Sequence, residues 1–292
     1  MIVSIGEPLL EFNQVEEKTF LQGFGGDSSN MIIAAARSGA RTAYVTRVGD
    51  DEFGRMFLDL WKKEGVGTDH VLVDREAPTG AYFVTHGPQG HAFSYLRAHS
   101  AASRLRPEDL PKIEASFVHA SGISMAISQS ACDTVLAAFE KATGKVSFDS
   151  NLRLRLWPLE RARAMIGKAA GMADYFFPSI EDARQLSGVE SAEGNLDWAH
   201  RLGARNVFLK LGPDGVLVSD GGKKERISGI KVKAVDATGA GDCFCGAALA
   251  RLAAGDSIWE AARYANAAAA LATTGYGAVE PLPRPDAVRK LA

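Results

Sequence analysis

The sequence of 292 residues has little of what marks secreted, membrane-spanning or nucleic-acid-binding proteins. It holds three cysteines, Cys132, Cys243 and Cys245, and an odd number without zinc-ligand spacing argues against a disulfide framework or a zinc site. Lys and Arg are dispersed and the net charge is −2, so nothing favours a nucleic acid or an acidic membrane as partner. The most apolar stretch, 265–272, is too short to span a bilayer, and 1–7 indicates a first strand, not a signal peptide. We therefore expect a cytoplasmic protein with reduced thiols.

The segments that are present alternate between strand-like and helix-like patterns, which predicts an α/β fold with a largely parallel sheet. Apolar residues make up 46% of the chain, enough for a core without metals or disulfides. No long linker or internal repeat divides the chain, so we expect one domain over 1–292. We expect strands at 2–5, 42–48, 117–120, 146–149, 175–177, 206–211 and 216–219, and helices at 29–38, 53–64, 131–143, 159–170, 243–254 and 258–273.

Two segments interrupt this alternation and predict a small separate sheet. Residues 11–20 are polar and extended, and 81–96 alternate like a hairpin with Gly87-Pro88-Gln89-Gly90 as its turn. Such an appendage often closes over a site, so we expect a lid formed by about 9–22 and 80–98. Exposed strands of this kind leave unpaired edges, and a homodimer through the lid is therefore an option that the sequence leaves open.

The segment Asp236-Ala237-Thr238-Gly239-Ala240-Gly241-Asp242 is the strongest candidate for chemistry. It follows a strand-like stretch, 230–235, and opens an Ala-rich helix, where free N–H groups and the helix dipole attract anions. We expect the amides of Gly239, Ala240 and Gly241 to hold a transferring phosphoryl group while Asp242 accepts a hydroxyl proton. On this segment alone, an ordinary glycine turn with an acidic first helical turn remains an equal alternative. The chain has no Walker A loop, no dinucleotide-binding glycine series and no G-x-S-x-G elbow.

Two signatures together resemble the ribokinase-like (PfkB) carbohydrate kinase family. The segment 236–242 is similar to its C-terminal signature D-T-x-G-A-G-D, with Ala237 in place of Thr. Gly25-Gly26-Asp27-Ser28-Ser29-Asn30 is similar to its N-terminal signature, and the likeness continues through Gly39 and Arg47-Val48-Gly49. The resemblance covers essentially the whole chain. It implies a mostly parallel central sheet flanked by helices, a small β-sheet lid, and an ATP-dependent sugar kinase with Asp242 as the base.

Within that family, several stretches resemble the branch that phosphorylates 2-keto-3-deoxygluconate: 6–9, 24–27, 93–97, 121–127 and 148–157. This acceptor carries a carboxylate, which needs a charge partner in a closed pocket. Arginine suits bidentate contact with a carboxylate, so the resemblance implies that Arg97 and Arg153 hold the acid end. In the alternative, both arginines are surface residues paired with local acids.

The resemblance also implies further contacts. Gly26 and Asp27 would reach sugar hydroxyls, and Tyr82 and Tyr95 would pack over the sugar, with ordinary strand packing as the alternative for both tyrosines. The residues implied for ATP are Ser179, Lys210, Gly212, Gly215, Gly239, Gly241, Asn266 and Gly277. Ser179-Ile180-Glu181-Asp182 replaces the family's N-x-x-E, so Glu181 or Asp182 would be the outer carboxylate for Mg²⁺, unless it only complements the helix dipole. Mg²⁺ is expected with ATP, and several family members also bind a monovalent cation.

Three hypotheses follow. In the first, the protein transfers the γ-phosphoryl group of ATP to the terminal hydroxyl of 2-keto-3-deoxygluconate. In the second, the fold and chemistry are the same but the acceptor is fructose, ribose or another neutral sugar. In the third, a ligand-sensing or scaffold protein has kept the fold and lost catalysis, against which the intact 239–242 segment speaks.

Overall fold

The central element of the fold is a large twisted sheet. In the computed structural model, which describes residues 1–87 and 90–291, this sheet has ten strands: β1 Ile2–Ile5, β4 Thr42–Gly49, β5 Val66–Gly67, β6 Val71–Asp74, β9 Phe117–Ser121, β10 Lys145–Asp149, β11 Tyr175–Phe177, β12 Asn206–Lys210, β13 Gly215–Ser219 and β14 Lys224–Ser228. Their order is β14-β13-β12-β11-β10-β9-β1-β4-β5, with β6 beside β4. All pairs are parallel except β12 with β13 and β13 with β14. The predicted largely parallel sheet is thereby confirmed.

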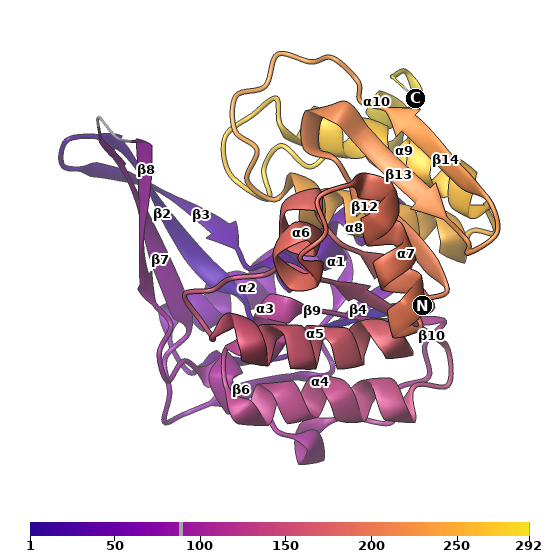
Figure 1. Cartoon of the computed structure of the whole chain (residues 1–292). Coiled ribbons are helices and arrows are strands. Elements are labelled where there is room, and N and C mark those ends of the chain that lie inside the picture. The colour runs from indigo at the N-terminus through magenta and orange to yellow at the C-terminus, as the bar shows by residue number, and fades with distance from the viewer. Residues whose placement is uncertain (88–89, 292) are drawn as a thin grey trace.

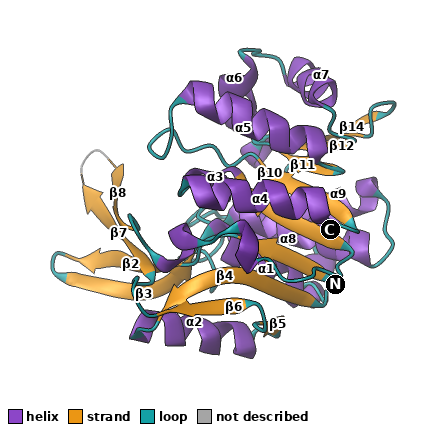
Figure 2. Cartoon of the chain, turned by 90° about the horizontal axis from the view of Figure 1, so that it is seen from below, coloured by secondary structure: helices purple, strands orange, loops and turns teal. Residues whose placement is uncertain are grey.

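Helices cover both faces of this sheet (Figures 1 and 2). One face packs against α1 Asp27–Arg37, α2 Glu52–Lys63, α8 Ala240–Ala253, α9 Ile258–Ala272 and α10 Pro285–Arg289, and the other against α3 Gly122–Ala126, α4 Gln129–Lys141, α5 Leu159–Met172, α6 Ile180–Ser187 and α7 Ala192–Leu202. Strand β1 shows why both faces need helices, because its apolar side chains point to both. Ile2 packs in the core on the α1 face, and Val3 and Ile5 pack in the core on the α4 face. Strands buried on both faces are apolar throughout, which is why the sequence located them well. None of the helices in the described ranges is long and apolar enough to cross a membrane, and the three cysteines are buried and unpaired.

A second, four-stranded sheet projects from this body, at the left of Figure 1. It consists of β2 Leu9–Glu16, β3 Thr19–Gly25, β7 Gly80–Gly87 and β8 Gly90–Leu96, in the order β3-β2-β7-β8. Its base is anchored by aromatic contacts with α2: Phe12 lies 5.9 Å from Phe53 and Phe24 lies 5.2 Å from Phe57, centroid to centroid. The predicted separate sheet is confirmed, and the two central residues of its predicted hairpin turn, Pro88 and Gln89, lie outside the described residues.

The predicted strand at 230–235 is wrong, and the edge strand β14 precedes it instead. The alternating apolar residues of 230–235 suggested a strand, but the backbone bonds to a helix terminus. The N–H groups of Val235 and Asp236 donate to the carbonyl oxygen of Thr273 at 2.7 and 3.1 Å. Residues 229–239 therefore form a loop that spans from the sheet edge to the start of α8.

Candidate active site

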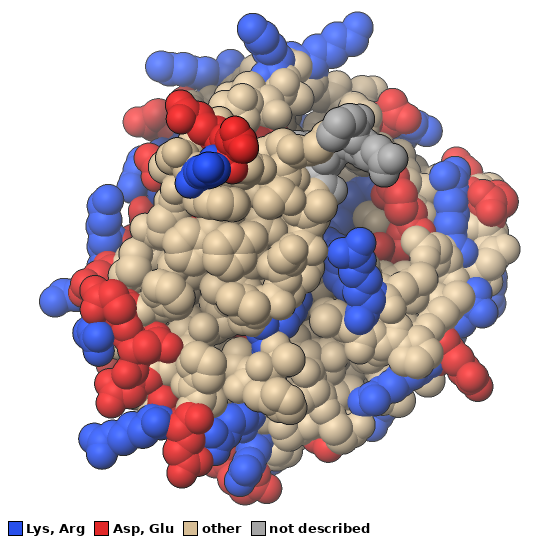
Figure 3. Space-filling model, turned by 90° about the vertical axis from the view of Figure 1, so that its left-hand side faces the viewer, with Lys and Arg blue, Asp and Glu red and all other residues tan. Residues whose placement is uncertain are grey.

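A deep cleft opens between the small sheet and the carboxyl ends of the central strands. Its cavity volume is about 1390 Å³, larger than the roughly 300–1,000 Å³ of an ordinary small-molecule pocket, so it has room for two ligands side by side. In Figure 3 the surface is hollowed beside the small sheet, and charged side chains of both signs lie in the hollow. In open α/β sheets, ligands bind outside the carboxyl ends of the strands, and this cleft occupies that position.

The glycine-rich loop before α8 forms one wall of the cleft. Gly239 has a φ of 75°, and a β-carbon there would lie 3.0 Å from the carbonyl oxygen of Ala278, so both conformation and space require glycine. The N–H of Ala240 donates to the carbonyl oxygen of Ala237 at 3.2 Å. Within the described residues, the N–H groups of Gly239 and Gly241 have no protein acceptor. Three amides were predicted to bind an anion. Those of Gly239 and Gly241 are available for a ligand, whereas that of Ala240 already donates to Ala237 within the turn.

Asp236 holds this loop in place. Its Oδ1 accepts hydrogen bonds from the backbone N–H and the hydroxyl of Thr238, at 2.9 and 2.7 Å, and its Oδ2 accepts one from the N–H of Gly277 at 3.0 Å. Gly277 does not line the cleft. The expectation that Gly277 contacts ATP is not supported by its position, because its amide is used to fix the loop.

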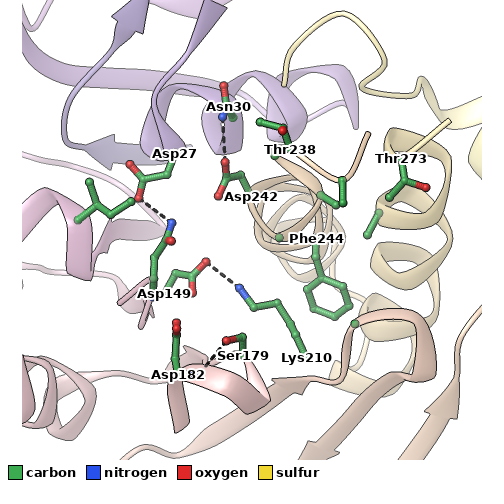
Figure 4. A pocket seen from close by; sticks show the side chains of 18 of the residues that line it. Asp27, Asn30, Asp149, Ser179, Asp182, Lys210, Thr238, Asp242, Phe244 and Thr273 are labelled. Atoms are coloured by element: carbon green, nitrogen blue, oxygen red, sulfur yellow. Dashed lines mark hydrogen bonds and ion pairs between the residues drawn. The ribbon is translucent and has the colours of Figure 1, made fainter. Parts of the chain in front are cut away.

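Asp242 lies in the first turn of α8 and points into the cleft (Figure 4). Its Oδ2 accepts a hydrogen bond from Nδ2 of Asn30, in α1, at 2.9 Å. Burial raises the pKa of Asp242 to about 7, and the negative charges of Asp27 and Asp149 contribute, while Asn30 and Lys210 lower it in part. A carboxylate with a pKa near neutrality is suited to accept a proton and release it again.

Asp27 and Asn30 form the opposite wall, at the N-terminus of α1. Oδ2 of Asp27 accepts a hydrogen bond from Nδ2 of Asn151 at 3.1 Å, and Asn151 has a φ of 27°, a conformation that is rare outside glycine. In the described structure, Oδ1 of Asp27 and Oδ1 of Asn30 are buried without a hydrogen-bond partner. Burial raises the pKa of Asp27. Two unpaired acceptors at one place are suited to the hydroxyl groups of a ligand.

An ion pair crosses the floor of the cleft. Nζ of Lys210, at the end of β12, lies 2.8 Å from Oδ2 of Asp149, at the end of β10 (Figure 4). Sγ of Cys245 donates to the same oxygen at 3.4 Å. Burial alone would lower the pKa of Lys210, but the Asp149 carboxylate and other nearby acids hold it above its ordinary value. Lys210 is therefore charged, and its charge is already balanced by Asp149.

Asp182, in the first turn of α6, supports the loop after β10. Its Oδ2 accepts hydrogen bonds from the hydroxyl of Ser150 at 2.7 Å and from the N–H of Leu152 at 3.0 Å. Its backbone N–H donates to Oγ of Ser179 at 3.0 Å. Burial raises the pKa of Asp182. Across the described ranges, no cluster of three or more His, Cys, Asp or Glu residues could hold a metal ion unaided.

The two predicted arginines both line the cleft but differ in charge balance. Arg97, directly after β8, forms an ion pair with Oε2 of Glu7, and Oε1 of Glu7 accepts a hydrogen bond from Ser100 at 2.8 Å. Nε of Arg97 is buried without a partner in the described chain. Arg153 is exposed, and its Nη1 donates to the carbonyl oxygen of Leu152 at 2.8 Å. No carboxylate in the described residues lies within ion-pair distance of Arg153, and the charge of Arg153 acts on the Asp182 carboxylate from further away, lowering the pKa of Asp182 in part.

The structure brings nearly all of the predicted site residues to this one cleft. Those that line it are Gly26, Asp27, Tyr82, Tyr95, Arg97, Arg153, Ser179, Asp182, Lys210, Gly212, Gly215, Gly239, Ala240, Gly241, Asp242 and Asn266. Asn266 also donates to the carbonyl oxygen of Ser228 at 2.9 Å, which fixes α9 against the sheet edge.

Sequence reasoning missed several residues of the cleft, among them Glu7, Asn30, Asp149 and Asn151. Asp149 ends a predicted strand, which is a usable signal, because catalytic side chains cluster at such ends. Asn30 and Asn151 lay inside the matched signatures without being assigned a contact. No local pattern marked Glu7, whose partner Arg97 is 90 positions away.

Comparison with known proteins gives concordant matches. The pfkB family of carbohydrate kinases matches residues 1–285. The 2-dehydro-3-deoxygluconokinase of Thermoproteus tenax is 35% identical over 304 aligned residues, covering 99% of this chain and 93% of that protein. The Bacillus subtilis (strain 168) protein of the same name is 34% identical, covering 92% of this chain and 86% of that protein. The crystal structure of fructokinase from Vibrio cholerae O395 with fructose, ADP and a calcium ion superposes with a TM-score of 0.92 at 31% identity, covering 99% and 98% of the two chains. A double mutant of that fructokinase was crystallised with fructose, ADP and a potassium ion.

Proposed function

Because the chain belongs to the pfkB family of carbohydrate kinases and is a sugar kinase, we propose that its acceptor is 2-keto-3-deoxygluconate, also called 2-dehydro-3-deoxygluconate. In this proposal the protein transfers the γ-phosphoryl group of ATP to the terminal hydroxyl of that sugar acid. Two relatives with this activity in their names are 35% and 34% identical to the chain over nearly its full length.

The observation that carries the proposed chemistry is the position of Asp242 between a helix N-terminus and the side chains of α1. Asp242 would accept the proton of the attacking hydroxyl, and Asn30 would keep its carboxylate oriented. The free N–H groups of Gly239 and Gly241 would stabilise the charge on the transferring phosphoryl group, together with the dipole of α8. Phosphoryl transfer requires mostly this positioning and electrostatic stabilisation.

The lack of a direct ion-pair partner for Arg153 in the described residues supports an acidic acceptor. A sugar acid brings a carboxylate into the cleft, and removing that carboxylate from water costs several kcal/mol unless a cation receives it. Arg153 supplies that cation, and Nε of Arg97 supplies a hydrogen-bond donor that lacks a protein partner. The side-chain oxygens of Asp27 and Asn30 that lack a hydrogen-bond partner would accept hydrogen bonds from the hydroxyl groups of the sugar.

The remainder of the cleft fits a magnesium-bound nucleotide. Ser179, Gly212, Gly215 and Asn266 line the part of the cavity next to the glycine-rich loop. Asp182 and Asp149 supply carboxylates there, which is the ligand type that Mg²⁺ takes in small number alongside phosphates and water. When bound, Mg²⁺ would neutralise charge on the phosphates. We include a monovalent cation in the proposal because the related fructokinase was crystallised with potassium.

We also propose that the small sheet acts as a lid and that it mediates a homodimer. The cleft-facing side of the sheet carries Tyr82, Phe93 and Tyr95, which line the cavity. The small sheet also has exposed apolar side chains, Phe20, Leu21 and Leu96, which are available for contact with a second subunit. Analytical ultracentrifugation of the wild type and of Leu96→Glu tests the dimer, and a wild-type monomer at all concentrations contradicts it.

A coupled ADP-release assay over a panel of sugar acids and neutral sugars tests the proposed acceptor. We expect turnover with 2-keto-3-deoxygluconate and much lower kcat/KM with fructose or ribose. Arg153→Ala should raise KM for the sugar acid by about 10- to 100-fold, since a charge-assisted contact contributes roughly 1.5–3 kcal/mol, and should change KM for a neutral sugar little. Arg163→Ala, a remote arginine bonded to the carbonyl oxygen of Gln185, is the matched control. Equal losses for both acceptors would remove the argument for an acid.

A kinase for a neutral sugar is the alternative that one observation favours. Glu7 balances the charge of Arg97, so only Arg153 of the two predicted arginines lacks an ion-pair partner among the described residues. The solved fructokinase also shares the fold at 31% identity. Preference for fructose over every sugar acid in the same panel would establish this alternative.

A further inference from the structure

Glu11 and Tyr82 form a buried pair inside the small sheet. Glu11 lies on β2, directly beside Tyr82 on β7 in the register of the sheet. The hydroxyl of Tyr82 donates to Oε2 of Glu11. The two side chains are 3% and 6% exposed, so this contact is shielded from water. A charge-assisted hydrogen bond in such a place is among the stronger polar contacts in a protein.

Two glycines on β3 make the space for this pair. A β-carbon at Gly23 would lie 3.2 Å from Oε1 of Glu11, and a β-carbon at Gly25 would lie 2.6 Å from the hydroxyl oxygen of Tyr82. Gly23 is the direct register partner of Glu11. A larger side chain at Gly23 or Gly25 would press on the carboxylate or the phenol, so β3 is shaped around their contact.

Glu11 also reaches the loop at the end of α9. A β-carbon at Gly277 would lie 3.5 Å from Oε1 of Glu11, which places the carboxylate against that loop. The N–H of Gly277 donates to Asp236, and Asp236 binds Thr238 at the start of the glycine-rich loop. Burial raises the pKa of Glu11, and the charge of Asp236 raises it further. Glu11 therefore stands between the small sheet and the residues that hold the glycine-rich loop.

Tyr82 transmits the position of Glu11 to the cleft. Tyr82 lines the cavity, whereas Glu11 does not. The ring of Tyr82 lies 5.8 Å from that of Tyr95, and the guanidinium of Arg97 lies 5.4 Å from the ring of Tyr95, centroid distances in each case. Moving Tyr82 would therefore move the aromatic surface and the arginine that line the cavity on this side.

We propose that Glu11 is a positioning residue that fixes Tyr82 in the acceptor subsite and connects the small sheet to the loop at Gly277. The inference rests on the proposed function only in taking the cavity beside Tyr82 as the acceptor subsite. The carboxylate of Glu11 has two roles in this proposal, one for each oxygen. One oxygen, Oε2, orients the tyrosine, and the other, Oε1, faces the loop at Gly277, whose N–H donates to Asp236.

Steady-state kinetics of Glu11→Leu, Glu11→Gln, Tyr82→Phe and the double variant Glu11→Leu/Tyr82→Phe test the proposal, with the acceptor that the wild type phosphorylates best. We expect Glu11→Leu and Tyr82→Phe each to raise the acceptor KM about tenfold with a smaller effect on kcat, as the loss of one buried hydrogen bond predicts. Glu11→Gln keeps an acceptor oxygen for the hydroxyl and should restore KM to within about threefold of the wild type. Tyr175→Phe, at a partly buried tyrosine that packs against the core away from the cleft, is the matched control and should leave the acceptor KM unchanged.

The double variant decides whether Glu11 acts through Tyr82. If it does, its acceptor KM equals that of the worse single variant, because the second substitution removes a contact that is already lost. If the two increases in acceptor KM instead multiply, to about a hundredfold in the double variant, Glu11 and Tyr82 make independent contacts and the proposal is overturned. Hydrogen exchange of the 273–279 peptide should rise in Glu11→Leu and stay at the wild-type level in Tyr82→Phe, and unchanged exchange in both would overturn the connection to the loop. A wild type without activity on any sugar acid would refute the proposed acceptor but not this inference, since the kinetics use whichever acceptor is turned over.

Discussion

Replacing the proposed base with its neutral isostere, Asp242→Asn, should abolish activity and stabilise the fold at alkaline pH. The carboxylate is needed for proton transfer, so turnover should fall by about two to four orders of magnitude. Its ionised form is unfavourable in the empty cleft, because burial, Asp27 and Asp149 raise its pKa from 3.8 to about 7. Asn removes that unfavourable charge and can still accept the hydrogen bond from Asn30.

The size of the stabilisation expected for Asp242→Asn, and its pH dependence, follow from the raised pKa of Asp242. A rise of about three pKa units corresponds to about 4 kcal/mol, at 1.36 kcal/mol per unit. Water in the open cleft screens part of this, so we expect about 2 kcal/mol at pH 8, or on the order of 5 °C in Tm. Since the folded-state pKa is the higher one, the wild type loses this stability as pH rises from about 4 through 7. The advantage of Asp242→Asn should therefore be only about two fifths of its full size at pH 5 and fully present at pH 8.

Thermal unfolding of both proteins at pH 5 and pH 8, followed by circular dichroism, measures this difference, and the ADP-release assay measures turnover. Asp133→Asn on the exposed side of α4 is the matched control and should show no pH-dependent advantage. A variant that is less stable than the wild type at pH 8, or equally stabilised at both pH values, would refute the electrostatic account of Asp242. Retained turnover would refute its role as base.

Three further outcomes are expected. The pH profile of kcat/KM should fall below an apparent pKa of about 7, reaching about a tenth of its plateau at pH 6, because only ionised Asp242 accepts a proton; a flat profile between pH 6 and 8 contradicts this. Arg37→Met should lower the free energy of unfolding by about 3 kcal/mol in urea titration, since Arg37 donates to Leu282 at 2.7 Å and its removal leaves the buried side chain of Glu64 with only the longer ion pair to Arg284, at 3.7 Å; a loss below 1 kcal/mol contradicts it. Gly239→Ala should cut kcat at least tenfold while acceptor KM stays near the wild-type value, because φ is positive and the loop is close to Ala278; normal kcat would refute the need for glycine.

The large sheet could be predicted from the sequence because its strands are buried on both faces. Such strands are short apolar runs bounded by turns, and the runs at 2–5 and 175–177 coincide with β1 and β11. The stretch 230–235 shows where this reasoning fails. Its alternation is typical of a strand, but the carbonyl oxygen of Thr273, at the end of α9, takes the N–H groups that a neighbouring strand would have taken.

Side-chain pairing is the part of the site that sequence reasoning could not supply. Arg97, Lys210 and Asp242 were predicted to share one site, and all three line the cleft. Their charge states depend on partners that are distant along the chain. Glu7 balances Arg97 and Asp149 balances Lys210, and no local spacing shows either pair. Gly277 illustrates the reverse case, because it lies in the expected loop but does not line the cleft, and its amide donates to Asp236.

The hydrogen bond between Asn30 and Asp242 joins residues that are 212 positions apart, and this separation determines when the protein can become active. Synthesis delivers α1 early, but the carboxylate that it orients is made only after four fifths of the chain. No shorter nascent fragment contains both halves of the site. Turnover should therefore appear as one of the last events of folding, after the slow closure of a very long loop.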